Sequence, residues 1–388
     1  MLAARMPARS GSPSLDAMAP LAVRAALLVA IGVELAVLVA FVPETVTRFW
    51  AGGPGDFANL YVRARHLRLM GLYSPVLTPI LYPISLAGLH AGFRIFFCIN
   101  VAALMAVAYI AQRPLRMPEA RLAVALAVVS LPQAQWALRF GHTTPLLALA
   151  MLCGFLLVQR HPVRGAAVLA LLSIKPQYAV APIIYLAARR RFLLIAVLTS
   201  VSLALAGIGF AVVGPGEAAA YVREALNWSS NTTSNLLPVQ QAWMYSWPGF
   251  LISIGVEPNR LLTADLLLLS AGVTLVACAR LDGMRAASVA ALSMILVTPY
   301  SQFYDACLLT AAFALLVRAR LRPVATGALI GGLYVAAVVS QANTIYPVRD
   351  VLGDAATDGV FWITPALLLA IAALAVFAPI RAGGEEAA

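Results

Sequence analysis

Long apolar segments separated by short clusters of arginine are the feature that most constrains the fold of this chain. A membrane-crossing helix needs about 20 mainly apolar residues, and segments of this kind recur from residue 20 onward. Of 388 residues, 62% are hydrophobic and only 11% are charged, so a water-soluble fold would leave more apolar surface than one core can bury. A helix satisfies its own backbone hydrogen bonds within lipid. The sequence therefore predicts an all-α, polytopic transmembrane helical bundle.

The predicted bundle is a single domain, because no polar linker interrupts the apolar segments. It is expected to hold about 10–12 membrane helices, including a re-entrant pair. Residues 1–19 are predicted to be a disordered tail, 20–380 the membrane domain and 381–388 a cytoplasmic tail. The predicted spans are 20–43, 93–112, 121–138, 145–159, 192–213, 260–279, 285–298, 303–318, 323–341 and 360–380.

The net charge of +11 comes from basic residues that lie between the apolar segments and not along a basic helix or arm. This pattern disfavours nucleic-acid binding and is typical of membrane orientation, because loops rich in Lys and Arg stay in the cytoplasm. The N-terminus is then expected inside. The clusters are Arg113, Arg116 and Arg121; Arg160 and Arg164; Arg189, Arg190 and Arg191; Arg280 and Arg285; and Arg318, Arg320 and Arg322.

The segment 164–188 does not fit a simple crossing. Arginines at both of its ends favour the cytoplasm, yet it is long enough for only one passage and contains Lys175 followed by Pro176. Proline disfavours helix at the preceding residue, and a lysine is costly at membrane depth. We therefore expect two short helices that bend at Lys175, entering from the inside and returning. A lysine at such a break is more often functional than a snorkelling anchor.

The first outer loop, roughly 44–92, contains the most informative polar residue. Apolar residues follow Asp56 at helical spacing, which predicts an amphipathic helix at the outer membrane surface. Asp56 is either the N-cap of this helix or a general base that takes a proton from an attacking hydroxyl, and the two roles are compatible.

Two further outer turns carry polar groups. The first, at 135–147, contains Arg139 and His142, which either contact a phosphate or sugar or serve as interfacial anchors beside Trp136. The second, at 298–309, contains polar and aromatic residues that suit either sugar binding or an interfacial belt with a helix cap. Those residues are Tyr300, Gln302, Tyr304 and Asp305.

In order along the chain, these segments resemble the glycosyltransferases of family 87, the type that uses polyprenyl-phosphate mannose and has the multi-helix membrane fold called GT-C. The matching pieces are GDF followed by Y and LY in 55–73, FGH-x-x-x-LL at 140–147, KPQ followed by P at 175–182, and TPY followed by YD at 298–305. The second piece departs from the family pattern, which often has Gln where this chain has His142.

The resemblance implies glycosyl transfer by an inverting single displacement, with Asp56 as the general base. It implies a polyprenyl-phosphate sugar as donor, mannose being expected, and a lipid or glycan as acceptor. No cofactor and no metal are implied, because the candidate carboxylates are scattered and lack ligand spacing. The residues expected at the donor phosphate are Lys175, Arg139 and Arg63, and those expected at the sugar or acceptor are His142, Gln177, Tyr300, Gln302, Tyr304 and Asp305.

The predicted topology places the active site on the extracytoplasmic face of a multi-pass protein in the cell inner (plasma) membrane. A membrane transporter or lipid-linked glycan flippase remains the main alternative, because such proteins also carry ionisable groups and broken helices at membrane depth. A non-catalytic membrane subunit is a second alternative. The long outer loops and the lack of an internal repeat favour the enzyme.

Overall fold

The computed structural model describes residues 15–52, 55–69, 73–231, 244–319, 321–341 and 363–377. Within these residues the regular structure is helical, apart from one isolated bridge between Met244 and Gln302. The helices are α1 (Leu15–Ala51), α2 (Gly55–Arg65), α3 (Leu77–Leu86), α4 (Leu89–Gln112), α5 (Pro118–Ser130), α6 (Pro132–Phe140), α7 (Thr144–Arg160), α8 (Pro162–Leu169), η1 (Ala170–Ile174), η2 (Pro176–Ala179), α9 (Val180–Ala188), α10 (Phe192–Val213), α11 (Pro215–Asn231), α13 (Trp247–Ser253), α14 (Arg260–Arg280), α15 (Gly283–Ser293), η3 (Phe303–Leu308), α16 (Leu309–Arg318), α17 (Pro323–Val339) and α19 (Ile363–Phe377).

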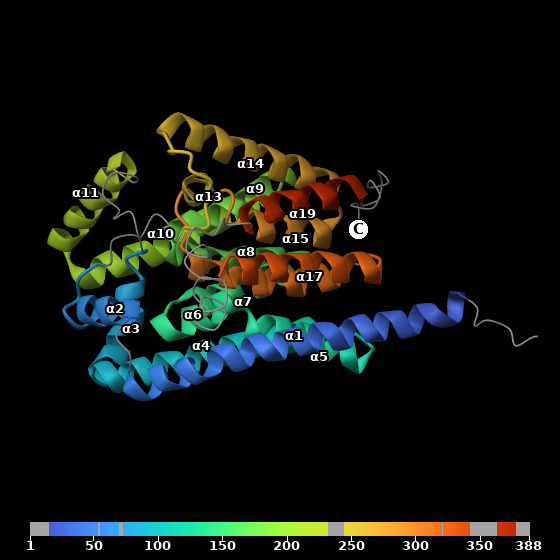
Figure 1. Cartoon of the computed structure of the whole chain (residues 1–388). Coiled ribbons are helices and arrows are strands. Elements are labelled where there is room, and N and C mark those ends of the chain that lie inside the picture. The colour runs from blue at the N-terminus through green and yellow to red at the C-terminus, as the bar shows by residue number, and fades with distance from the viewer. Residues whose placement is uncertain are drawn as a thin grey trace, which may run out of the picture.

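The long helices lie side by side, and two ends of the bundle can be distinguished (Figure 1). The start of α1 and the end of α19 lie at one end, whereas α2, α3 and α11 gather at the other (Figure 1). Helices α7, α15 and α16 are largely buried at the centre, with many small residues at their contacts. Small residues allow helix backbones to approach closely where lipid supplies no hydrophobic driving force. The predicted all-α, polytopic membrane bundle is confirmed.

Four helical stretches of the described residues are long and apolar enough to cross a membrane, or five when the bent pair α5 and α6 is taken as one span. One of these stretches begins at Ala22 within α1 and continues to Arg65, but its 44 residues would exceed any bilayer if straight. Gly52 has a φ of +63°, which turns the chain between α1 and α2. We therefore assign the crossing to α1, and place α2 outside it.

Several predicted boundaries were wrong. Helix α1 begins at Leu15 and ends at Ala51, so it is longer than the predicted 20–43 at both ends. The loop predicted at 44–92 also contains α3, which the sequence pattern did not indicate. Residues 15–19 of the predicted disordered tail 1–19 belong to α1, whereas the rest of that tail and the predicted tail at 381–388 lie outside the described residues.

The predicted span 121–138 is two helices. Helices α5 and α6 meet at an angle of 43° on either side of Leu131. Leu131 precedes Pro132, has an extended ψ of 121° and ends the first helix, because the proline ring disfavours the helical conformation there. This bend carries α6 toward α1, where Gln135 accepts a hydrogen bond from Thr45.

The re-entrant pair predicted for 164–188 agrees with the contacts of its ends and its tip. Arg191, just after α9, donates a hydrogen bond to the carbonyl of Val158 near the end of α7, so the pair enters and leaves at the same end of the bundle. At the tip, the backbone N–H of Ser74, in the segment between α2 and α3, donates to the carbonyl of Ile174 at 2.7 Å. Between η1 and η2 the chain is extended at Lys175, with φ −112° and ψ 98°.

Helix α2 docks on the turn between α6 and α7 by close packing. Its buried face comprises Phe57, Leu60 and Ala64, and the Phe57 ring stacks on Phe96 with centroids 5.5 Å apart. Gly141 ends α6 in the left-handed region, with a φ of +63°. A Cβ at Gly141 would lie 2.6 Å from the Cβ of Phe57. Glycine is therefore required at this contact.

We predict that Gly141→Ala loosens the docking of α2. Alanine in the left-handed region costs about 1–2 kcal/mol before the collision with Phe57 is added. The expected result is a lower unfolding temperature in detergent and faster proteolysis near α2.

The matched control is Gly331→Ala, at an exposed position in α17 where a Cβ would meet no atom within 4 Å. Alanine is a better helix former than glycine, so this variant should be unchanged or slightly more stable. Equal behaviour of the two variants would contradict the proposed packing.

Candidate functional site

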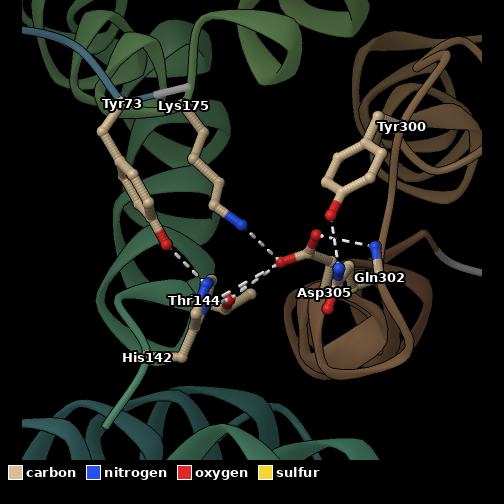
Figure 2. A network of polar contacts seen from close by, with 7 residues as sticks. All are labelled: Tyr73, His142, Thr144, Lys175, Tyr300, Gln302 and Asp305. Carbon is tan, nitrogen blue, oxygen red and sulfur yellow. Dashed lines mark hydrogen bonds and ion pairs between the residues drawn. The ribbon is translucent and has the colours of Figure 1, made fainter. Parts of the chain in front are cut away.

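Seven polar residues from four separate parts of the chain converge where the break at Lys175 meets the segment before α3 (Figure 2). They come from the loop before α3, the turn between α6 and α7, the break between η1 and η2, and the segment leading into η3. We call this set the polar cluster: Tyr73, His142, Thr144, Lys175, Tyr300, Gln302 and Asp305.

Asp305 is the centre of the polar cluster. Its Oδ1 lies 2.8 Å from the Lys175 Nζ, and its Oδ2 accepts a hydrogen bond from the backbone N–H of Gln302 at 3.0 Å. The side chain of Asp305 is fully buried and that of Lys175 is 5% exposed. A buried charge is tolerated only when it is paired and hydrogen-bonded. The two groups therefore depend on each other.

Lys175 is also surrounded by aromatic rings. Its ammonium lies 5.2 Å from the ring centroid of Tyr73 and 5.5 Å from those of Tyr178 and Tyr304. Ring faces attract a cation, and more strongly where water is excluded. The break before Pro176 thus directs the only lysine of the chain into a cage that holds positive charge. The predicted interior position of Lys175 at a helix break agrees with this geometry.

His142 is connected on both sides. Its Nε2 lies 2.6 Å from the hydroxyl of Tyr73, and its Nδ1 contacts the hydroxyl of Thr144. Thr144 in turn donates to Oδ1 of Asp305 at 3.3 Å, as Figure 2 shows. Burial, and secondarily the charge of Lys175, holds the pKa of His142 well below its usual range. His142 is therefore neutral at physiological pH.

Asp56 lies in the first turn of α2, beside the polar cluster. Burial raises the pKa of its carboxyl, while a hydrogen bond from Tyr304 and the charge of Lys175 oppose that rise. Tyr304 also lies against the His142 ring, with centroids 4.2 Å apart. The helix begins at Gly55, so Asp56 is its second residue and not the N-cap, one of the two roles considered from the sequence. A carboxyl with a raised pKa is better suited to accept a proton.

Arg139 does not join Lys175. Its side chain is 3% exposed, and its guanidinium donates to three groups of α1: Glu44 at 2.7 Å, Thr45 at 3.0 Å and the carbonyl of Phe41 at 2.6 Å. The predicted grouping of Arg139 with Lys175 is thus absent from this geometry. Sequence alone could not reveal it, because the partner Glu44 lies 95 positions earlier.

Arg63 and Gln177 also lie outside the polar cluster. The exposed Arg63 donates from Nη1 to the carbonyl of Leu69 at 2.6 Å and so stabilises the chain that follows α2. Gln177 lies in η2, two residues after Lys175, and is partly exposed. Of the residues expected at the sugar, the structure gathers His142, Tyr300, Gln302, Tyr304 and Asp305 around Lys175.

Three residues of this region were not assigned a role from the sequence: Tyr73, Thr144 and Tyr178. Tyr73 belongs to one of the short pieces that carry the family resemblance, which is the signal that could have indicated it. Thr144 stands at the start of a helix and Tyr178 in an apolar run, where each is expected as an ordinary structural residue.

We predict that Asp305→Asn destabilises the protein strongly. It leaves the buried ammonium of Lys175 without a carboxylate, a loss worth about 3–5 kcal/mol of unfolding free energy. Chemical or thermal unfolding in detergent measures it. The double variant Lys175→Met with Asp305→Asn should recover part of the loss, because no buried charge is left unpaired.

Asp282→Asn is the matched control, because Asp282 is an exposed N-cap of α15 and asparagine caps equally well. Its effect should stay below about 0.5 kcal/mol. A double variant as unstable as Asp305→Asn would show that the ion pair is not what these residues contribute.

The comparisons with known proteins identify the family. The model of glycosyltransferase family 87 matches residues 72–299, more than half of the chain. The matched segment contains His142 and Lys175, whereas Asp56 and Asp305 lie outside it. No curated protein and no solved structure matches. Together with the apolar helices of the bundle, the match shows that this multi-pass membrane protein belongs to glycosyltransferase family 87.

Proposed function

We propose that this glycosyltransferase transfers a sugar, with mannose as the first candidate, from a polyprenyl-phosphate donor to a lipid or glycan acceptor. The transfer takes place at the extracytoplasmic face of the inner (plasma) membrane, by an inverting single displacement. One observation carries the proposal: a buried, caged lysine and a carboxyl with a raised pKa lie together where the re-entrant tip meets the first outer loop.

Lys175 binds the phosphate of the donor. An ammonium has three N–H donors, so its bond to Asp305 at 2.8 Å leaves capacity for a phosphate oxygen. The phosphate is the leaving group, and a fixed cation stabilises the negative charge that develops on it. Arg139 and Arg63 do not enter this site, because the Arg139 guanidinium is bonded to Glu44 of α1 and that of Arg63 to the carbonyl of Leu69 after α2. Lys175 is thus the cation assigned to the donor.

Asp56 is the general base. It removes the proton from the acceptor hydroxyl as that oxygen attacks the anomeric carbon, and the bond between this carbon and the phosphate oxygen breaks. The phosphate departs with its electron pair, so no general acid is needed. The stereochemistry at the anomeric carbon is inverted in this single step. The raised pKa of Asp56 places its proton affinity closer to that required of a base near neutral pH.

The position of the polar cluster also favours a lipid-linked donor. The cluster includes Tyr73, just before α3, and α2 and α3 lie at the end of the bundle opposite the start of α1 (Figure 1). Arg189 and Arg191 follow α9, away from the break at Lys175, and donate to the carbonyls of Leu281 and Val158. By the positive-inside rule, the arginine-rich end is cytoplasmic. Nucleotide sugars are made in the cytoplasm, whereas a polyprenyl tail can lie between helices while its phosphate reaches Lys175.

We predict that Asp56→Asn lowers the transfer rate by about 100-fold or more, the usual contribution of a general base. The amide is nearly isosteric, so folding and donor binding should persist. Single-turnover transfer by the purified protein measures the rate, and donor binding is measured separately.

Asp282→Asn is again the control, and it should transfer at the rate of the unmodified protein, since Asp282 lies on the exposed start of α15. If Asp56→Asn kept more than about a tenth of the rate, Asp56 would not be the base.

We also predict transfer from a polyprenyl-phosphate sugar in detergent with excess chelator, with no divalent metal required. The assay offers either this donor or the matching nucleotide sugar to the purified protein, together with candidate lipid acceptors. Labelled product is separated by chromatography. Transfer from the nucleotide sugar alone would refute the donor class, and loss of transfer on chelation would refute the metal-free reaction.

A further inference from the structure

One line of contacts in the polar cluster has no role in the mechanism above. It runs from the hydroxyl of Tyr73 through both ring nitrogens of His142 and the hydroxyl of Thr144 to Oδ1 of Asp305 (Figure 2). Its first and last hydrogen bonds measure 2.6 Å and 3.3 Å. His142, Thr144 and Asp305 are fully buried, so water does not compete for these contacts.

The direction of each hydrogen bond follows from Asp305. As a carboxylate paired with Lys175, Asp305 can only accept, so Thr144 donates its proton to it. The Thr144 oxygen then accepts from His142, which requires the proton on Nδ1. The ring is neutral, as its lowered pKa indicates, so Nε2 carries no proton and accepts from the hydroxyl of Tyr73. The charge on Asp305 thus fixes the orientation of a phenolic proton three residues away.

This polarity determines what Tyr73 can do. Its proton is committed to His142, so its oxygen can only accept hydrogen bonds. Unlike the three buried residues behind it, Tyr73 is partly exposed. Its ring lies 5.2 Å from the Lys175 ammonium, next to the proposed phosphate site. A sugar attached to that phosphate would bring its hydroxyl groups within reach of Tyr73.

We propose that Tyr73 accepts a hydrogen bond from a hydroxyl group of the donor sugar, and that His142 and Thr144 are positioning residues that keep Tyr73 an acceptor. The proposal rests on the assignment of Lys175 to the donor phosphate. A site with a fixed acceptor rejects a sugar that lacks the matching hydroxyl, because the acceptor is then left without a partner. Tyr73 thereby determines which sugar is transferred.

The first experiment compares the complete donor sugar with a series of monodeoxy analogues, each on polyprenyl phosphate. The unmodified enzyme should discriminate against one analogue by about tenfold or more in kcat/KM, the value of one hydrogen bond. Tyr73→Phe should lower kcat/KM for the complete donor but not for that analogue, so the discrimination disappears. Equal loss for every donor would show a structural role only and would overturn the assignment.

The second experiment tests the positioning residues. Thr144→Val cannot accept from His142, so the ring is free to place its proton on Nε2, and discrimination against the same analogue should fall. Thr144→Ser keeps the hydroxyl and should restore it. Unchanged discrimination in Thr144→Val would overturn the positioning role.

The matched control is Thr310→Val. Thr310 lies in α16 and is also fully buried, but its hydroxyl donates to the carbonyl of Cys307 in η3. This variant should discriminate among the donors as the unmodified enzyme does. Lost discrimination in this control would show that the effect of Thr144→Val is not specific.

The two proposals fail in different ways. If the unmodified enzyme transfers from no polyprenyl-phosphate sugar, the proposed donor class is wrong. The role proposed for Tyr73 depends on that donor and is then wrong as well. If the enzyme transfers well but Tyr73→Phe leaves the kcat/KM ratio between the complete donor and every deoxy analogue unchanged, only the role proposed for Tyr73 is wrong. Discrimination that disappears for deoxy acceptors and not for deoxy donors would also overturn the donor assignment of Tyr73.

Discussion

The ion pair between Lys175 and Asp305 is the interaction on which this site depends. Its two groups are buried and come from segments 130 positions apart, so it fixes the re-entrant tip against η3. Two charges in a low-dielectric interior gain little net free energy from their attraction, because removing them from water is costly. The pair is therefore a poor device for stability alone. Its value lies in holding a cation at a defined place, and the aromatic cage and the Gln302 N–H offset part of the cost.

The position of Asp56 depends on packing and not on charge. Helix α2 is short, and its register on the bundle is set by Phe57 against Gly141, Phe93 and Phe96. Gly141 is followed directly by His142. The same turn therefore packs against α2 and supplies the residue that connects Tyr73, through Thr144, to Asp305. A displacement of α2 would thus move the proposed base relative to the proposed phosphate site.

Sequence patterns predicted the features that arise from local chemistry. Apolar segments and arginine clusters predicted an all-α bundle, Lys175 before Pro176 predicted a helix break, and the spacing after Asp56 predicted α2. The bend at Leu131 was missed, although Pro132 was the signal for it. The partners of long side chains could not be predicted. The sequence around Arg139 is equally compatible with a bond to a phosphate and with the bond to Glu44 that the structure has. Tyr73 and Thr144 acquire significance only through contacts distant in the chain.

The two buried cations, Arg139 and Lys175, differ in their surroundings, and only the fold shows which of them is structural and which is proposed to be functional. Arg139, near the end of α6, and His142, three positions later, contact different parts of the protein: Arg139 contacts α1, whereas His142 contacts Tyr73 and Thr144. Arg139 binds three groups of α1, and its partner Glu44 is 39% exposed, so this ion pair is partly solvated and serves to hold α6. The partner of Lys175 is fully buried and shared with Thr144 and the backbone of Gln302. The contacts of Arg139 with α1 hold the end of α6 in place. They thereby also fix the position of His142 and its hydrogen bonds at the proposed site.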